Sequence, residues 1–404
     1  MGAARVRSSY VVFGATGVLV LVGALFFRPA AGAEKPRVPS SDAEVLERLP
    51  LGATDPRDRE QVRLRRAVQA NPNDLRAALA LARLDIELSR SRSDPRYLSY
   101  AQAALGAFWD MPQPPTEVLV LRATIRQSVH DFDGALADLD AVLARDAGNA
   151  QAWITRSVVL AVKGRYEEAK ASCQPLVRLA PELVHVVCET SIDAVTGGAA
   201  AAYDRLASVI ATSRRLSPAE NEWAVSTLGE IAQRMGRDAD AEKHFREALA
   251  LDPDDPYVVS ALADLLLDLG RPKEAEALVH GKTDNDNLLL RLALAESQGH
   301  VGDVRAHAKL LRERFDASHL RGDTVHRREE ARFVLGLEDD PAAALALARA
   351  NWDVQREPWD VRVLLEAALA AKEPRAAAPA LDFLDEYHLE DPRILALAGK
   401  LRAR

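Results

Sequence analysis

The chain has 404 residues, of which 48% are apolar, so it holds enough material for a long hydrophobic core. Only 5% are aromatic, and Ala and Leu dominate, which favours packed helices over a β-sheet. The formal net charge of -8, without a long basic run, argues against a nucleic-acid-binding protein. Nine of the 52 basic residues are Lys, and this preference for Arg, together with the many Ala residues, indicates a GC-rich bacterial genome.

The first 33 residues have the composition of a targeting segment. Arg5 and Arg7 precede an apolar stretch at residues 10–27, and the small residues 31–33 follow it. This order predicts a secretory signal peptide that is cleaved before Glu34, and export to the periplasm. The alternative is an uncleaved inner-membrane anchor, because 18 apolar residues can just span a bilayer. In both cases the rest of the chain is expected in the periplasm, and only this segment would touch the membrane.

Residues 34–59 contain Pro and Arg, and we expect a linker over residues 34–70 with one short helix at residues 41–49. Residues 71–110 then predict a first, irregular helix pair, near residues 74–88 and 95–108.

Two later segments, residues 150–183 and 222–255, share one 34-residue pattern. Gly stands at position 15, Ala at position 20 and Pro at position 32 of both: Gly164 and Gly236, Ala169 and Ala241, Pro181 and Pro253. Gly at the end of a first helix permits a left-handed turn, Ala lets the second helix pack closely, and Pro stops it. Such a short helix pair cannot bury its own apolar face, so neighbouring pairs must stack on it.

This pattern resembles the tetratricopeptide repeat. In residues 222–255 seven signature positions of that family agree, namely Leu228, Gly229, Gly236, Ala241, Phe245, Ala248 and Pro253. The resemblance implies an all-α, right-handed solenoid of about eight helix pairs. Repeats at 116–149, 150–183, 184–221, 222–255 and 256–281 extend the array over residues 71–281. Residues 282–404 predict degenerate helix pairs, with a capping helix at residues 391–404.

Residues 326–365 are also similar to exported proteobacterial tetratricopeptide-repeat proteins of unassigned role. The function that the resemblance implies is a protein-interaction scaffold, or adaptor, that binds a partner segment in its concave groove. One alternative is a periplasmic factor for the maturation or assembly of an envelope or metalloenzyme complex. Another is a ligand- or metal-binding enzyme with its site in residues 282–404.

Sequence motifs for catalysis are absent. The chain has no G-x-S-x-G, H-E-x-x-H, G-x-x-x-x-G-K-[ST], G-x-G-x-x-G or C-x-x-C pattern. We therefore expect no enzyme activity, no cofactor and no metal ion, and a protein or peptide as the partner.

The two cysteines lie on successive helices of the predicted array. Cys173 precedes Pro181 by eight residues, and Cys188 follows it by seven, so antiparallel helices hold them at equal height. In an oxidising compartment this favours a disulfide. The alternative is a pair of buried thiols.

The family resemblance also implies which side chains line the concave groove. Positions 2, 5, 9, 12 and 13 of the first helix of each repeat give a candidate partner-binding set of Trp223, Glu230, Gln233, Tyr257, Asp264 and Asp268. Two aromatic rings beside acidic side chains would suit an apolar segment with basic flanks. The alternative is that both rings pack between repeats.

Overall fold

The computed structural model describes residues 55–92, 94–213, 216–320, 322 and 324–403, and every regular element in these ranges is a helix. They fall into two compact units, with a boundary between Val118 and Leu119, and each unit is described by itself. The predicted targeting segment at 1–33 and the short helix at 41–49 lie outside the described residues. Within those residues no helix is long and apolar enough to cross a membrane.

The first unit contains α1 (Pro56–Ala70), α2 (Leu75–Arg92), α3 (Arg96–Ala104) and α4 (Gly106–Trp109). Helix α1 occupies the end of the stretch predicted as a linker, so the array begins earlier than expected. Asp55 caps this helix, and Pro56 stands at its first position. Its contact with α2 includes a buried hydrogen bond from Gln61 to Asp85, of 2.5 Å. Part of the packing of α1 is polar, so its sequence has few of the apolar residues from which a buried helix is predicted.

The second unit begins within α5 and follows the predicted repeats as successive helix pairs. Its first elements are α5 (Thr116–Ser128), α6 (Phe132–Arg145), α7 (Ala150–Val162), α8 (Tyr166–Cys173), α9 (Leu176–Leu179), α10 (Glu182–Asp193), α11 (Ala199–Thr212), α12 (Pro218–Arg234), α13 (Asp238–Leu251), α14 (Pro256–Asp268) and α15 (Pro272–Val279). Gly164 and Gly236 follow α7 and α12 with φ of 72° and 70°, the left-handed turn that the repeat pattern predicts.

The degenerate half continues with paired helices. They are α16 (Asp286–Gly299), α17 (Val304–Leu320), α18 (Arg327–Phe333), the π-helical turn η1 (Val334–Glu338), α19 (Pro341–Trp352), α20 (Pro358–Ala370), the 3-10 turn η2 (Pro374–Ala377), α21 (Ala378–Tyr387) and α22 (Pro392–Arg402). The all-α solenoid predicted from the repeats is confirmed.

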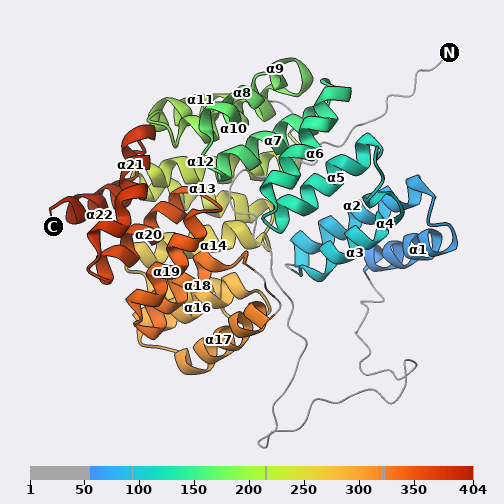
Figure 1. Cartoon of the computed structure of the whole chain (residues 1–404). Coiled ribbons are helices and arrows are strands. Elements are labelled where there is room, and N and C mark those ends of the chain that lie inside the picture. The colour runs from blue at the N-terminus through green and yellow to red at the C-terminus, as the bar shows by residue number, and fades with distance from the viewer. Residues whose placement is uncertain (1–54, 93, 214–215, 321, 323, 404) are drawn as a thin grey trace, which may run out of the picture. The chain divides into compact units, whose positions relative to one another are not determined.

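The C-terminal helices fold back onto the inner face of the middle repeats. Figure 1 shows α20 and α22, in red, beside α12 and α13. Hydrogen bonds join segments far apart in sequence: the Arg356 amide donates to the Val162 carbonyl at 2.8 Å, and the Ala199 amide donates to Glu390 at 3.1 Å. Arg393 of α22 also contacts Asp238 of α13 at 2.8 Å.

An aromatic cluster seals this contact. The ring of Tyr166, on α8, lies 5.7 Å from that of Phe383 and 4.8 Å from that of Tyr387, both on α21. Trp352 packs edge-on against Phe383 at 5.3 Å. The C-terminal helices therefore pack against the inner face of the middle repeats, and α22, at the position predicted for a capping helix, contacts α13 and α14 there.

Candidate functional site

A polar cavity of about 90 Å³ remains where α12 and α14 face α18, α20 and α22; we call it the inner chamber. Its lining consists of Glu230, Gln233, Arg234, Tyr257, Ser260, Ala261, Asp264, Arg291, Arg328, Arg332, Glu357, Pro358, Trp359, Arg362, Asp391, Arg393 and Ile394. Four of the six predicted groove residues are among these. The chamber is large enough for several water molecules or a small polar group.

Helix caps fix the two repeat helices that carry the predicted residues. Ser217 and Glu220 form a capping box at the start of α12. Asp255 accepts hydrogen bonds from the amides of Tyr257 and Val258 at the start of α14. With both helix starts fixed, residues three to four positions apart, such as Glu230 and Arg234, are held on the same inner face.

Asp264 is the most buried charged group of the chamber, with 3% of its surface exposed. It binds two arginines: Arg291 approaches to 2.7 Å, and Arg332 also approaches to 2.7 Å. Burial by itself would raise the pKa of this carboxyl, but the two positive charges outweigh burial and bring the pKa down to about 2. Asp264 is thus an internal ion pair, and its charge is already neutralised by the chain.

Asp268 is neutralised in the same way and lies outside the chamber lining. Arg362 binds both of its oxygens, at 2.6 and 2.7 Å, and Arg393 lies 3.2 Å away. Arg332 and Arg362 each stack on the ring of Trp359, at 4.4 and 4.6 Å from its centre. Such contacts hold arginine planes in place at the chamber wall.

Glu230 and Tyr257 contact one another directly, since the Tyr257 hydroxyl donates to Glu230. Arg234 donates to the second oxygen of Glu230 at 3.0 Å. Only 9% of Arg234 is exposed, and this is the one hydrogen bond that its side chain makes among the described residues. A guanidinium has five N–H donors, so Arg234 presents unused donors to the chamber.

Trp223 does not line the inner chamber, although the repeat pattern predicts it as a groove residue. Only 5% of it is exposed, and it lines a second cavity rather than the inner chamber. The other side chains that line this cavity come from α7, α8, α10 and the start of α20. The ring of Trp223 is therefore packed between repeats, which was the alternative prediction. Tyr257, in contrast, is partly exposed in the chamber.

The arginines that come from the degenerate half were not among the predicted site residues; they include Arg291, Arg332, Arg362 and Arg393. A signal was present, because residues 250–270 carry five acids and no base. Two of these acids, Asp264 and Asp268, are the residues that bind the arginines. The 34-residue pattern could not say which of the many arginines supply them.

The structure joins Cys173 of α8 to Cys188 of α10 by a disulfide, with 5.8 Å between the two Cα atoms. The bond ties the second helix of one repeat to the first helix of the next. Among the residues described, no group of three or more His, Cys, Asp or Glu side chains is placed to hold a metal ion.

These features define a class, a stack of antiparallel helix pairs whose inner face carries a small polar chamber. Comparison with known families gives the same result, because residues 120–183 and 232–286 both match tetratricopeptide repeats. These two segments of the chain are tetratricopeptide repeats. Repeats of this kind serve as scaffolds for protein–protein interaction, which is the general class of function of this chain.

Known proteins with similarity to the chain include the DnaJ homolog subfamily C member 7 homolog of Schizosaccharomyces pombe, which is 26% identical over 201 residues. The match covers 49% of this chain and 34% of that protein, so the chain spans about a third of the length of this relative.

Solved structures with similar chains share little sequence with it. A tetratricopeptide repeat protein from Parabacteroides merdae is 14% identical, with 71% of this chain and 98% of that chain covered and a TM-score of 0.37. For PilW, a type IV pilus biogenesis factor, the identity is 13%, the coverage 70% and 97%, and the TM-score 0.34. For the human IFIT1 dimer with m7Gppp-AAAA, the identity is 11%, the coverage 86% and 87%, and the TM-score 0.47.

Proposed function

We propose that this protein is an exported scaffold without catalytic activity, and that it holds a partner protein at the inner chamber. The observation that carries the proposal is Arg234. Arg234 is nine-tenths buried, its side chain makes one hydrogen bond among the described residues, and it lines a chamber that Gln233 also lines. An acceptor supplied by a partner would complete the hydrogen bonding of this guanidinium and so add affinity.

The chemistry of the chamber favours an acidic group on the partner, in place of the basic flanks expected from the sequence. Asp264 and Asp268 already bind arginines of the chain, and Glu230 binds Arg234 and Tyr257. These three carboxylates are therefore paired within the chain, whereas Arg234 keeps N–H donors that have no acceptor among the described residues. An Asp or Glu side chain of a partner would complete the hydrogen bonding of Arg234.

Crosslinking in the living cell tests this binding site. A photoreactive amino acid at Gln233, which lines the chamber, is expected to crosslink a protein partner in the envelope fraction. The matched control carries the same group at Lys309, whose side chain is 74% exposed on α17, away from the chamber. The variant Arg234→Gln should reduce the Gln233 crosslink at least tenfold, about the effect of losing 1.4 kcal/mol of binding energy. Equal crosslinking from Gln233 and Lys309 would contradict the proposal.

Two observations support export. The first is the order of basic, apolar and small residues at 1–33, and the second is the Cys173–Cys188 disulfide, a bond that persists in oxidising compartments. A phosphatase reporter fused after Asp42 should be active, and an inactive reporter would refute export. N-terminal sequencing of the mature protein separates cleavage before Glu34 from an uncleaved anchor.

A further inference from the structure

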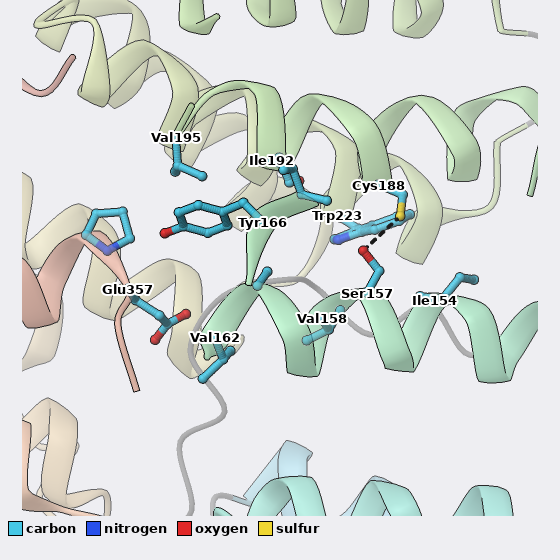
Figure 2. Close-up of a pocket in the computed structure, with 13 residues that line it drawn as sticks. Ile154, Ser157, Val158, Val162, Tyr166, Cys188, Ile192, Val195, Trp223 and Glu357 are labelled. Atoms are coloured by element: carbon cyan, nitrogen blue, oxygen red, sulfur yellow. Dashed lines mark hydrogen bonds between the residues drawn. The ribbon is translucent and has the colours of Figure 1, made fainter. Parts of the chain in front are cut away.

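A second cavity, of about 30 Å³, lies between α7, α8, α10, α12 and the turn that precedes α20. We call it the valine-lined cavity, because its walls are mainly aliphatic. Its lining consists of Ile154, Ser157, Val158, Ala161, Val162, Tyr166, Cys188, Ser191, Ile192, Val195, Trp223, Glu357 and Pro358. Figure 2 shows that most of these side chains come from the repeats, whereas Glu357 comes from the C-terminal segment that folds back.

Two polar atoms of this cavity have no hydrogen-bond partner among the described residues. They are the indole nitrogen of Trp223 and one carboxylate oxygen, Oε1, of Glu357. Trp223 is 5% exposed and Glu357 is 6% exposed, so neither atom can form a hydrogen bond with bulk water. A buried donor or acceptor that is left without a partner destabilises the fold. Figure 2 places them at opposite ends of the cavity, with Tyr166, Val158 and Ile192 between them.

The remaining polar groups of the lining are already satisfied. The Ser157 hydroxyl donates to the Ala169 carbonyl at 2.9 Å, and the Ser191 hydroxyl donates to the Val187 carbonyl at 2.7 Å. The Tyr166 hydroxyl donates to the Arg356 carbonyl at 3.3 Å. The cavity therefore offers one donor at the Trp223 end and one acceptor at the Glu357 end, and aliphatic walls between the two ends.

The charges around Glu357 favour a cation at its end of the cavity. One guanidinium, that of Arg328, serves three buried carboxylates: Glu357 at 2.9 Å, Glu329 at 3.1 Å and Asp360 at 3.4 Å. Burial raises the pKa of Asp360 to about 6, and the neighbouring Glu357 carboxylate adds to the rise, although Arg328 lowers it. The side chain of His326 lies near Glu329 and is also buried. A positive group on the free oxygen of Glu357 would correct the imbalance.

We propose that the valine-lined cavity binds a short, unbranched aliphatic amine that carries a hydrogen-bond acceptor at its far end. The simplest member of this class is an ω-amino alcohol. Its ammonium group would donate to Oε1 of Glu357, its hydroxyl oxygen would accept from the indole N–H of Trp223, and its methylene chain would lie along Val158, Val162 and Ile192. The site is separate from the inner chamber, although Glu357 and Pro358 form part of both walls.

The size of the cavity fits such a ligand and limits its length. A water molecule needs about 10–15 Å³ of cavity volume, so this cavity holds two or three waters or one slender aliphatic chain. Waters would also satisfy the two orphaned atoms, but they would not distinguish one chain length from another. Selectivity for chain length therefore separates a ligand site from a hydrated void.

The test is a titration of the full folded chain with 3-aminopropanol, 4-aminobutanol, 5-aminopentanol and 6-aminohexanol, followed by isothermal calorimetry and thermal melting. We expect saturable binding with one preferred chain length. The amine without the hydroxyl group, and the diol without the amino group, should each bind at least tenfold more weakly at that length, because each lacks one hydrogen bond.

Variants locate the binding. Val158→Phe fills the cavity, and Trp223→Phe removes the donor, so both should lower the affinity at least tenfold. The control Val177→Phe changes a side chain that is 57% exposed and outside the cavity, and should bind as wild type does. Circular dichroism identifies a variant that fails to fold. Absence of saturable binding for every chain length, or equal affinity in Trp223→Phe, would overturn the proposal, and neither result bears on crosslinking at Gln233.

Discussion

Asp264 illustrates how individual residues hold this protein together. Its carboxylate joins three helices, because Arg291 belongs to α16 and Arg332 to α18 while Asp264 belongs to α14. Taking such charges out of water is expensive, and only mutual pairing makes it tolerable. The consequence is that the loss of one partner leaves the other charges buried and uncompensated.

The variant Asp264→Asn should therefore lower the free energy of unfolding by about 3–5 kcal/mol at pH 7. The control Asp133→Asn removes a carboxylate that is 86% exposed and pairs with Lys163, and should cost less than about 1 kcal/mol. Because the folded pKa of Asp264 is lowered to about 2, its contribution is complete above pH 4 and is lost as the pH falls from about 4 to 2. Urea unfolding at pH 7 and pH 3 measures both effects, and an equal cost at the two pH values would contradict this account.

Asp85, in the first unit, has the opposite pH dependence. It is fully buried, Gln61 donates to it, and burial raises its pKa to about 6. A raised pKa means that the folded state holds the proton more tightly, so stability falls as the pH rises from about 4 to 6. Asp85→Asn should thus raise the free energy of unfolding by about 1–3 kcal/mol at pH 7, and by little at pH 4. Urea unfolding checks this, and a gain that is independent of pH would refute it.

At the scale of the elements, the junction between α8 and α10 depends on a covalent bond as well as on packing. The Cys173–Cys188 disulfide closes a loop with a sequence separation of 15. In the chain-entropy account, closing a loop of this size stabilises a fold by about 3 kcal/mol.

The double variant Cys173→Ala, Cys188→Ala should therefore lose about 3 kcal/mol in urea unfolding, while its circular dichroism at 20 °C stays that of the wild type. Wild-type protein treated with dithiothreitol provides the comparison and should lose a similar amount. Two titratable thiols in the denatured, unreduced chain would show that the bond is absent.

Gly164 and Gly270 end first helices in two repeats with almost the same backbone, at φ of 72° and 67°. Their surroundings differ. A Cβ on Gly164 would lie 2.8 Å from the ring of Phe383 and 3.1 Å from Cβ of Arg356, whereas nothing lies within 4 Å of one on Gly270. Both substitutions to Ala should cost about 1–2 kcal/mol for the left-handed conformation. Gly164→Ala should cost about 1–3 kcal/mol more for the clash, as measured by thermal unfolding. Equal costs would contradict the contact between α21 and the α7–α8 turn.

At the scale of the second unit, the fold-back changes how the repeats depend on one another. In an open repeat array each repeat contacts only its neighbours, and unfolding can begin at any end. Here α20–α22 contact helices of the α7–α14 region directly. We therefore expect the early repeats and the C-terminal helices of this unit to open together.

Native-state hydrogen exchange tests that expectation. The variant Phe383→Ala removes a ring, 5% exposed, that packs against Tyr166 and Trp352, and should destabilise the unit by about 3–5 kcal/mol. If the unit opens as one, exchange should accelerate by the same factor in α7–α8 as in α20–α21. The solvent-exposed substitution Asp385→Ala on α21, 70% exposed, should change neither region. Acceleration confined to α21 would show that the C-terminal helices open independently.

The sequence by itself determined what is local and periodic. The 34-residue register placed the helix pairs, the turn after α7 at Gly164 and the turn after α12 at Gly236, because a left-handed turn and a close helix contact each require a particular residue type. Helical spacing also set Cys173 and Cys188 at equal height on adjacent helices. These features depend on a few neighbouring residues, so they can be read without knowledge of the whole.

The tertiary structure alone decided the occupant of the inner face. Arg332 and Asp264 are 68 positions apart, and Arg362 and Asp268 are 94 positions apart. The burial of Trp223 likewise depends on elements that are distant in the chain. A small rotation at each repeat accumulates along the stack, and the sum brings α20–α22 onto the middle repeats. The sequence of a single repeat does not specify this accumulated rotation. The repeat pattern therefore predicted candidate groove residues but not the arginines that neutralise Asp264 and Asp268.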